Sequence, residues 1–181
     1  GCVGVAWQAT VMPLKVFPDD GTTAVSTVVE AMYYAVDNGA FILNLSIGAG
    51  YEASFTGPIV ELWNQGGITV SAAGNDNQQF TDSQSTWSSP ACNNGNSPLT
   101  DNMNIGVGSV DSQDRKASWS NYDASTNRNF VDLVAPGVNL RGAGVYYPSV
   151  SGFTSYFTNN SGTSFSAPLV SGLAALLKAQ D

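Results

Sequence analysis

Short apolar runs alternate with helical patterns along this chain, and this alternation limits the possible folds more than any other feature. Two runs, FILNLSI (41–47) and ITVSAAGN (68–75), are nearly continuous, as in strands buried on both faces of a sheet. Apolar residues recur at helical spacing over 24–38, and a second helix is expected over 52–65. This order predicts βαβ units, a mostly parallel sheet and hence the α/β class, in one domain over 1–181.

Segments around this pattern complete the expected secondary structure. ATVMPLKVF (9–17) is rich in β-branched residues and predicts a strand, as do NIGVGSV (104–110) and VDLVAPG (131–137). The polar stretch 77–103 is expected to form one long surface loop. The last helix, over 164–179, is apolar nearly all round, which predicts full burial.

Charge and composition exclude two classes of partner. The net charge is −8 with only six Lys and Arg residues, so the surface repels nucleic-acid phosphates and anionic membranes. Abundant Ser, Thr, Asn and Gly with little Lys is typical of secreted proteins, and we expect an extracellular or secretory location. Cys2 and Cys92 fit no metal-ligand spacing, and their pairing, with each other or with cysteines elsewhere, is left open.

Small residues follow both buried runs and precede the last helix. In parallel sheets, ligands gather at the carboxyl ends of the strands. The clusters 46–50, 72–76 and 162–164 are therefore the candidate site, because small side chains let a substrate backbone come close.

Ser164 and Asn75 have the chemistry to act together. Ser164 lies near the start of the last predicted helix, where free N–H groups and the helix dipole favour an anion. The Ser164 N–H and the Asn75 side-chain amide are candidate donors to an oxyanion. Helix capping by Ser164 and a turn role for Asn75 are the commoner uses of such residues, and local chemistry alone favours them.

The motif around Ser164 changes this balance. The sequence GTSFSAP, from Gly162 to Pro168, closely resembles the nucleophile motif Gly-Thr-Ser-x-x-x-Pro of the subtilisin-like serine proteases. The segments GVAWQATVMPLKVF, ILNLSIGAG, VSAAGND, VGSVD, WSNYD and LVAPG resemble further segments of that family, in family order. The resemblance covers essentially the whole chain and implies the subtilisin-like three-layer α/β/α fold.

The resemblance also implies an activity and a set of site residues. The activity is that of a serine endopeptidase acting on peptides or proteins through an acyl-enzyme, with Ser164 as nucleophile and Asn75 as oxyanion-hole donor. Residues of two strand ends would bind the substrate, the first three through their backbone and the others around the residue before the cleaved bond: Ser46, Ile47, Gly48, Ala72, Ala73 and Gly74.

The chain departs from the family by lacking the aspartate and His-Gly-Thr motifs, and it contains no histidine. We therefore expect a domain incomplete at its N-terminal side, nearly inactive alone and completed by the missing segment, with an inhibitory propeptide as a further candidate partner. No cofactor or catalytic metal is expected. A structural calcium ion in the complete domain is left open; Asp132 matches a position near a weak cation site of relatives, although an ordinary carboxylate role is favoured.

Two rival functions remain. Gly48, Gly50 and Ala53 match the G-x-G-x-x-A dinucleotide fingerprint between a strand and a helix, with Asp76 near the place of a ribose-binding acid. Alternatively, the chain is a catalytically inactive subtilase-fold fragment or binding module.

Overall fold

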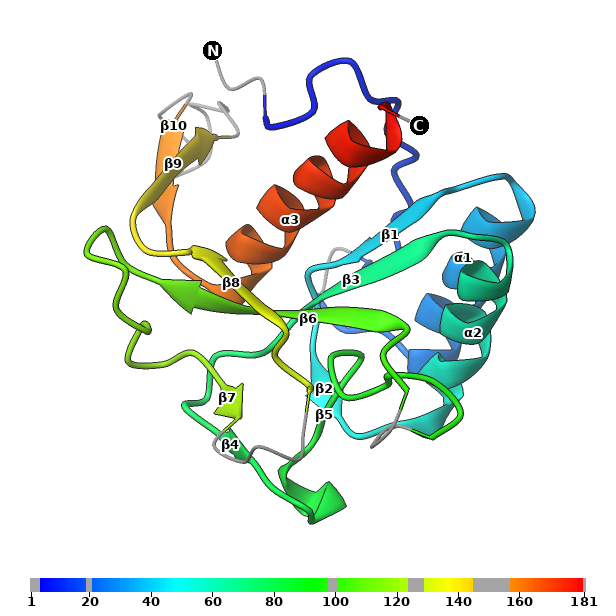
Figure 1. The fold of residues 1–181 in the computed structure, drawn as a ribbon, viewed down its shortest axis with the longest axis horizontal. Coiled ribbons are helices and arrows are strands. Elements are labelled where there is room, and N and C mark those ends of the chain that lie inside the picture. The colour runs from blue at the N-terminus through cyan, green and yellow to red at the C-terminus, as the bar shows by residue number, and fades with distance from the viewer. Residues whose placement is uncertain (1–3, 19–20, 98–100, 124–128, 145–156, 181) are drawn as a thin grey trace.

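The computed structural model describes residues 4–18, 21–97, 101–123, 129–144 and 157–180. Its centre is a sheet of four parallel strands in the order β1-β3-β6-β8 (Figure 1). These strands are β1 (Ile42–Leu45), β3 (Ile68–Ala72), β6 (Asn104–Val110) and β8 (Leu133–Pro136). The predicted α/β class with a mostly parallel sheet is confirmed.

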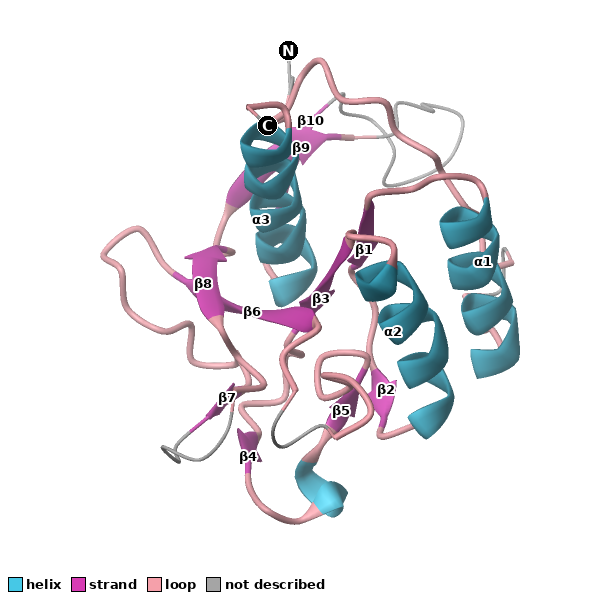
Figure 2. Cartoon of the chain, turned by 45° about the vertical axis from the view of Figure 1, so that its right-hand side comes forward, coloured by secondary structure: helices cyan, strands magenta, loops and turns pink. Residues whose placement is uncertain are grey.

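Helices cover both faces of this sheet, which confirms the three-layer arrangement (Figure 2). On one face lie α1 (Val25–Asp37) and α2 (Thr56–Asn64), and on the other lies α3 (Thr163–Lys178). The first core joins α1 and α2 to β1 through buried side chains that include Met32, Val36, Leu43, Ile59 and Leu62. Burying one such side chain contributes about 1.5–3 kcal/mol.

The face of the sheet under α3 forms a second core. Ala167 and Val170 pack against strand residues of β3, β6 and β8, namely Val70, Val107 and Ala135. Full burial of α3 is nevertheless a wrong prediction, because Leu173 is 49% exposed and Leu177 58% exposed. The helix contacts the sheet with one side only. The apolar composition of its outer side makes that side suitable for burial, but composition does not place another segment against it.

The predicted strand over residues 9–17 is also wrong. The segment is irregular, and Val11 is 78% exposed. A strand is stabilised by hydrogen bonds to a neighbour, and none of the described strands pairs with this segment. Its β-branched residues favour an extended backbone locally, but no described strand is available for the segment to pair with.

The stretch 77–103 is not one surface loop. Phe80, Trp87 and Cys92 are buried in it and form a third core with Phe130. Edge-to-face ring pairs stabilise this core, with centroids 4.9 Å apart for Trp87 and Phe130 and 5.9 Å apart for Phe80 and Phe130. Phe80 and Trp87 thus anchor this polar stretch to the rest of the protein. Residues 98–100 lie outside the described part.

Short elements surround the main sheet. Three two-stranded pairs join β2 with β5, β4 with β7, and β9 with β10. Their bounds, with those of the two 3-10 turns, are β2 (Ala49–Gly50), η1 (Ala53–Phe55), β4 (Gln79–Phe80), η2 (Gln84–Thr86), β5 (Ser88–Ser89), β7 (Tyr122–Asp123), β9 (Leu140–Ala143) and β10 (Phe157–Asn160).

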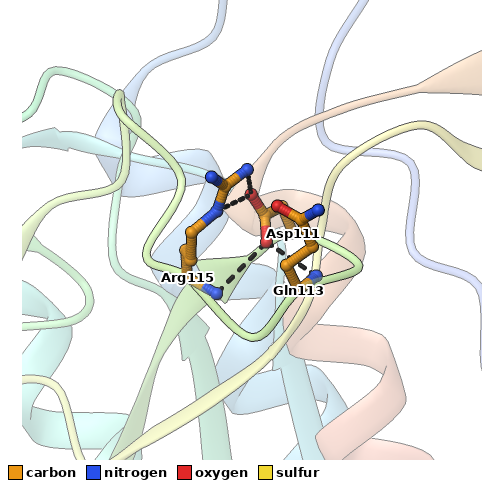
Figure 3. Close-up of polar contacts among 3 residues, drawn as sticks. All are labelled: Asp111, Gln113 and Arg115. Atoms are coloured by element: carbon orange, nitrogen blue, oxygen red, sulfur yellow. Dashed lines mark hydrogen bonds and ion pairs between the residues drawn. The ribbon is translucent and has the colours of Figure 1, made fainter.

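The turn after β6 is organised by one carboxylate (Figure 3). Asp111 Oδ2 accepts hydrogen bonds from Arg115 Nε and Nη2 at 3.0 and 2.8 Å, and Asp111 Oδ1 accepts one from the Gln113 N–H at 2.8 Å. The Arg115 hydrogen bond, followed by that of Gln113, lowers the pKa of Asp111. The turn directs the chain toward Trp119 and Asn121, beside the site described below.

The buried thiol of Cys92 gives the first test of this fold. Burial raises the pKa of Cys92 to about 12; the Ser88 N–H lowers it less, and Asp123 raises it further. Because the thiolate is the reactive species, we expect the folded Cys2→Ser variant to resist iodoacetamide at pH 8, and to be alkylated once in denaturant. Intact mass measures the added group, and rapid alkylation without denaturant would contradict the third core.

Candidate active site

A cavity of about 340 Å³ lies where β1 and β3 end and α3 begins. Parallel pairing places these strand ends together, since Leu45 lies opposite Ser71 in the sheet. The cavity is lined by residues of all three predicted clusters and by one residue from another segment: Ile47, Gly48, Ala49, Gly50, Ala72, Gly74, Asn75, Asp76, Ser88, Thr163 and Ser164.

Ser164 lies in the first turn of α3 and is half-buried. The N-cap is Gly162, whose φ of 153° favours glycine, so Ser164 is not the capping residue. Ser164 Oγ donates to the Ser46 carbonyl at 3.1 Å, and Ser46 Oγ donates to the Ser164 carbonyl at 2.8 Å. The Thr163 N–H donates to Asn75 Oδ1 and the Phe165 N–H donates to the Gly162 carbonyl at 3.0 Å, whereas none of the described residues accepts from the Ser164 N–H. The Ser164 N–H is therefore left as a donor for an anion at the start of α3.

The side chain of Asn75 is oriented by Thr163. Asn75 Oδ1 accepts hydrogen bonds from the Thr163 N–H at 2.9 Å and from Thr163 Oγ1 at 3.0 Å. Thr163 Oγ1 in turn accepts from the Gly74 N–H at 3.1 Å. With Oδ1 engaged, Nδ2 is the free end of the amide, and none of the described residues accepts a hydrogen bond from it. Asn75 and Ser164 therefore offer donors to one cavity.

The other predicted binding residues are placed unequally. Ile47, Gly48, Ala72 and Gly74 line the cavity, whereas Ser46 is adjacent through its bonds to Ser164. Ala73 is fully buried and its backbone is already used: its N–H donates to the Val107 carbonyl at 3.0 Å, and its carbonyl accepts from Asn121 Nδ2 at 2.9 Å. The binding roles of all six residues remain predictions.

Of the cavity residues, only Ser88 lies outside the three predicted clusters, while Thr163 and Asp76 lie within them without a role in the implied peptidase site. Thr163 had a signal, because it directly precedes Ser164 in the quoted motif. Ser88 comes from the stretch expected to be a surface loop, and nothing local distinguishes it. Asp76 belongs to the cluster 72–76 and has a specific role only in the dinucleotide alternative, yet it is the one charged residue among the described residues that line the cavity.

The geometry of the dinucleotide fingerprint does not favour that rival. Gly48 and Gly50 line the same cavity as Ser164, Gly50 belongs to the short strand β2, and η1 follows before α2 begins at Thr56. A dinucleotide site instead uses a tight turn that leads directly from strand to helix.

Within the described residues, no group of three or more His, Cys, Asp and Glu side chains is arranged to bind a metal ion. Asp132 Oδ2 accepts from the Gly106 N–H at 2.9 Å and Asp132 Oδ1 from Asn102 Nδ2 at 3.0 Å, and burial raises the Asp132 pKa. Both oxygens have protein partners, in agreement with the ordinary carboxylate role expected for Asp132, and a calcium ion in the complete domain remains a prediction. In the same described part, no helix has the length and apolarity needed to cross a membrane.

Comparison with solved structures supports the fold. A structure described as a cold adapted subtilisin-like serine proteinase superposes with a TM-score of 0.77 at 25% identity, covering 100% of this chain and 59% of that chain. The predicted subtilisin-like architecture is thereby confirmed.

Sequence comparison agrees. The chain is 32% identical over 181 residues to Thermophilic serine proteinase of Bacillus sp. (strain AK1), covering 99% of this chain and 38% of the relative. It is also 32% identical over 181 residues to Thermitase of Thermoactinomyces vulgaris, covering 99% of this chain and 55% of the relative. The chain thus spans between about two fifths and three fifths of the length of these proteins. The family model described as "Subtilase family" matches residues 1–181, and this chain belongs to that family of serine proteases.

Proposed function

We propose that this chain supplies the nucleophile and the oxyanion-hole donor of a serine endopeptidase. The observation that carries the proposal is the meeting of Ser164 and Asn75 at one cavity, at the N-terminus of α3. A nucleophilic hydroxyl and a preorganised amide donor are the two groups that must lie on either side of a reacting carbonyl.

The proposed reaction consumes one water molecule. Ser164 Oγ attacks the peptide carbonyl carbon while its proton passes to a base, and the carbonyl electron pair moves onto oxygen, where Asn75 Nδ2 and the Ser164 N–H donate to it. Collapse breaks the C–N bond, and the amine leaves with the proton from the base. Water then cleaves the ester in the same way and regenerates Ser164.

The base must come from residues outside this sequence, which contains no histidine. Ser164 Oγ donates instead to the Ser46 carbonyl, which cannot take up its proton. We expect the chain alone to be nearly inactive, since the members of a catalytic triad act as a unit. The missing aspartate and histidine would be supplied by a preceding segment of the same polypeptide or by a second chain.

A peptide or protein substrate would bind in extended form along residues 46–48 through backbone hydrogen bonds. The side chain before the cleaved bond would enter the cavity beside Ala72 and Gly74. We further propose secretion, on the composition of the chain, and an inhibitory propeptide as a partner. The competing function is an inactive module that keeps the fold and binds without cleaving.

Native intact mass spectrometry, followed by denaturing analysis, is the experiment that tests the need for a second part. We expect a complex that contains a polypeptide with the aspartate and His-Gly-Thr motifs, or one longer polypeptide that contains them. A fluorophosphonate should then label this assembly at Ser164, and the Ser164→Ala variant should remain unlabelled. Labelling independent of Ser164, or an assembly with both motifs and no labelling, would support the inactive module.

Asn75→Ala should lower kcat of the complete protease by about 10²–10³ with little change in KM, because the donor acts on charge that develops in the transition state. This scale is the one measured for the oxyanion-hole asparagine of subtilisin, a member of the same family. Steady-state kinetics on a peptide amide checks it. A raised KM with an unchanged kcat would instead place Asn75 in ground-state binding.

Asp76 should favour substrates with Lys or Arg before the cleaved bond. Asp76 is the one charged residue among the described residues that line the cavity, so a cationic side chain bound there would lie near its carboxylate. Asp76→Asn should lower kcat/KM for a Lys substrate by about fivefold relative to its Gln counterpart, the upper range for an exposed ion pair. Competition between paired peptides at low salt measures the ratio, and an unchanged ratio would remove Asp76 from substrate selection.

A further inference from the structure

Asn121 lies beneath the turn that carries Asn75 and is only 1% exposed. Its side-chain amide bonds to the backbone on both sides of Asn75. Asn121 Nδ2 donates to the Ala73 carbonyl at 2.9 Å, before Asn75 in the chain. Asn121 Oδ1 accepts from the Asp76 N–H at 3.0 Å and from the Gln78 N–H at 2.8 Å, after Asn75.

Backbone hydrogen bonds from the same segment reinforce this bridge. The Asn121 N–H donates to the Gly74 carbonyl at 3.1 Å, and the Asn77 N–H donates to the Trp119 carbonyl at 2.7 Å. Gly74 has a φ of 104°, and a Cβ there would lie 2.3 Å from Asn121 Nδ2. Asn77 has a φ of 51°, in a region sparsely populated by residues other than glycine. The turn is therefore an uncommon backbone shape that Asn121 fits closely.

The segment behind Asn121 is itself held in place. Lys116 Nζ donates to Asn77 Oδ1, to the Ala117 carbonyl and to the Ser120 carbonyl, at 3.0, 3.1 and 2.8 Å. Ser120 Oγ accepts from the Ser109 N–H of β6 at 3.0 Å. The position of Asn121 is thus fixed relative to the central sheet, and so is the turn that it bridges.

We propose that Asn121 is a positioning residue for the oxyanion hole. Thr163 fixes the Asn75 side chain at its Oδ1 atom, and Asn121 fixes the backbone from which that side chain extends. Asn121 does not line the cavity and acts on the reaction only through Asn75. This inference rests on the proposed peptidase function.

Each of the three hydrogen bonds made by the Asn121 side chain stabilises the turn that carries Asn75. Removing the Asn121 amide leaves the buried Ala73 carbonyl and the part-buried Asp76 and Gln78 N–H groups without this partner, and an unpaired buried polar group is unfavourable. The turn relieves this cost by moving, which shifts Asn75 Nδ2. Misplacement by about 1 Å of a group that contacts a transition state costs about a hundredfold in rate.

A double-mutant cycle in the complete protease separates positioning from general stability. We expect Asn121→Ala to lower kcat by about 10- to 100-fold and to leave KM within about twofold. In the Asn75→Ala background the same change should lower kcat by less than about twofold, because the donor that it displaces is already absent. An equal loss in both backgrounds would overturn the proposal.

Asn93→Ala is the matched control, because Asn93 is also fully buried and its side chain also makes three hydrogen bonds, with Ser89 Oγ, the Glu52 carbonyl and Thr56 Oγ1. Its effect on kcat should be the same with and without Asn75. Coupling of Asn93 to Asn75 as strong as that of Asn121 would show a diffuse effect of core damage and would count against a specific role.

Asn121→Asp covers the case in which Asn121→Ala fails to fold. The protonated carboxyl group can both donate to the Ala73 carbonyl and accept from the turn, whereas the carboxylate can only accept. Its kcat relative to the unaltered protease should therefore rise as the pH falls. A kcat ratio that is independent of pH, in a variant whose effect on kcat is the same with and without Asn75, would refute positioning by the amide.

Hydrogen exchange gives a readout that does not depend on catalysis. The Asp76 and Gln78 N–H groups should exchange about tenfold faster or more in Asn121→Ala than in the unaltered protease. Unchanged protection would overturn the bridge itself. Lost protection in a protein with no Ser164-dependent hydrolysis would keep the bridge, and would reject both the proposed function and the positioning role of Asn121.

Discussion

Parallel hydrogen bonding of β1, β3 and β6 places their carboxyl ends at one edge of the sheet, and the site depends on this arrangement. The helix α3 packs across the sheet with its N-terminus at the same edge, so Ser164 contacts Ser46, 118 residues earlier in the sequence. Asn75 follows β3 and reaches the same place. A nucleophile, an amide donor and a helix N-terminus meet because the strands run in one direction.

Hydrogen-bonded amides and hydroxyls, more than charges, shape this site. Thr163 fixes the orientation of the Asn75 amide, and Asn121 bridges the backbone around it. Such groups are costly to leave unpaired in a buried environment, so each one restricts its neighbours to a single arrangement. A donor fixed before the reaction begins stabilises the developing oxyanion without reorganisation, which is the property that the proposed chemistry needs.

The described surface is consistent with a protein that has further parts. The strand β1 lies at one edge of the sheet, and the outer side of α3 exposes Leu173, Leu176 and Leu177. Apolar surface and open strand edges are commonly covered in folded proteins. This supports the proposal that the residues which supply the base also complete the fold, and it links the expected inactivity of the chain alone to the same cause.

Several features follow from the sequence alone: the βαβ order, the approximate extents of the four strands of the main sheet and of the three helices, and the expectation that Ser164 and Asn75 act together. These features depend on local periodicity and on short motifs, which are readable along the chain. Contacts between distant segments were needed to show that 9–17 is no strand, that Phe80 and Trp87 are buried within 77–103, and that Asn121 bridges the backbone around Asn75. Each of these depends on which partner lies across space, and a buried asparagine in a polar stretch has the same local sequence signature as an exposed one.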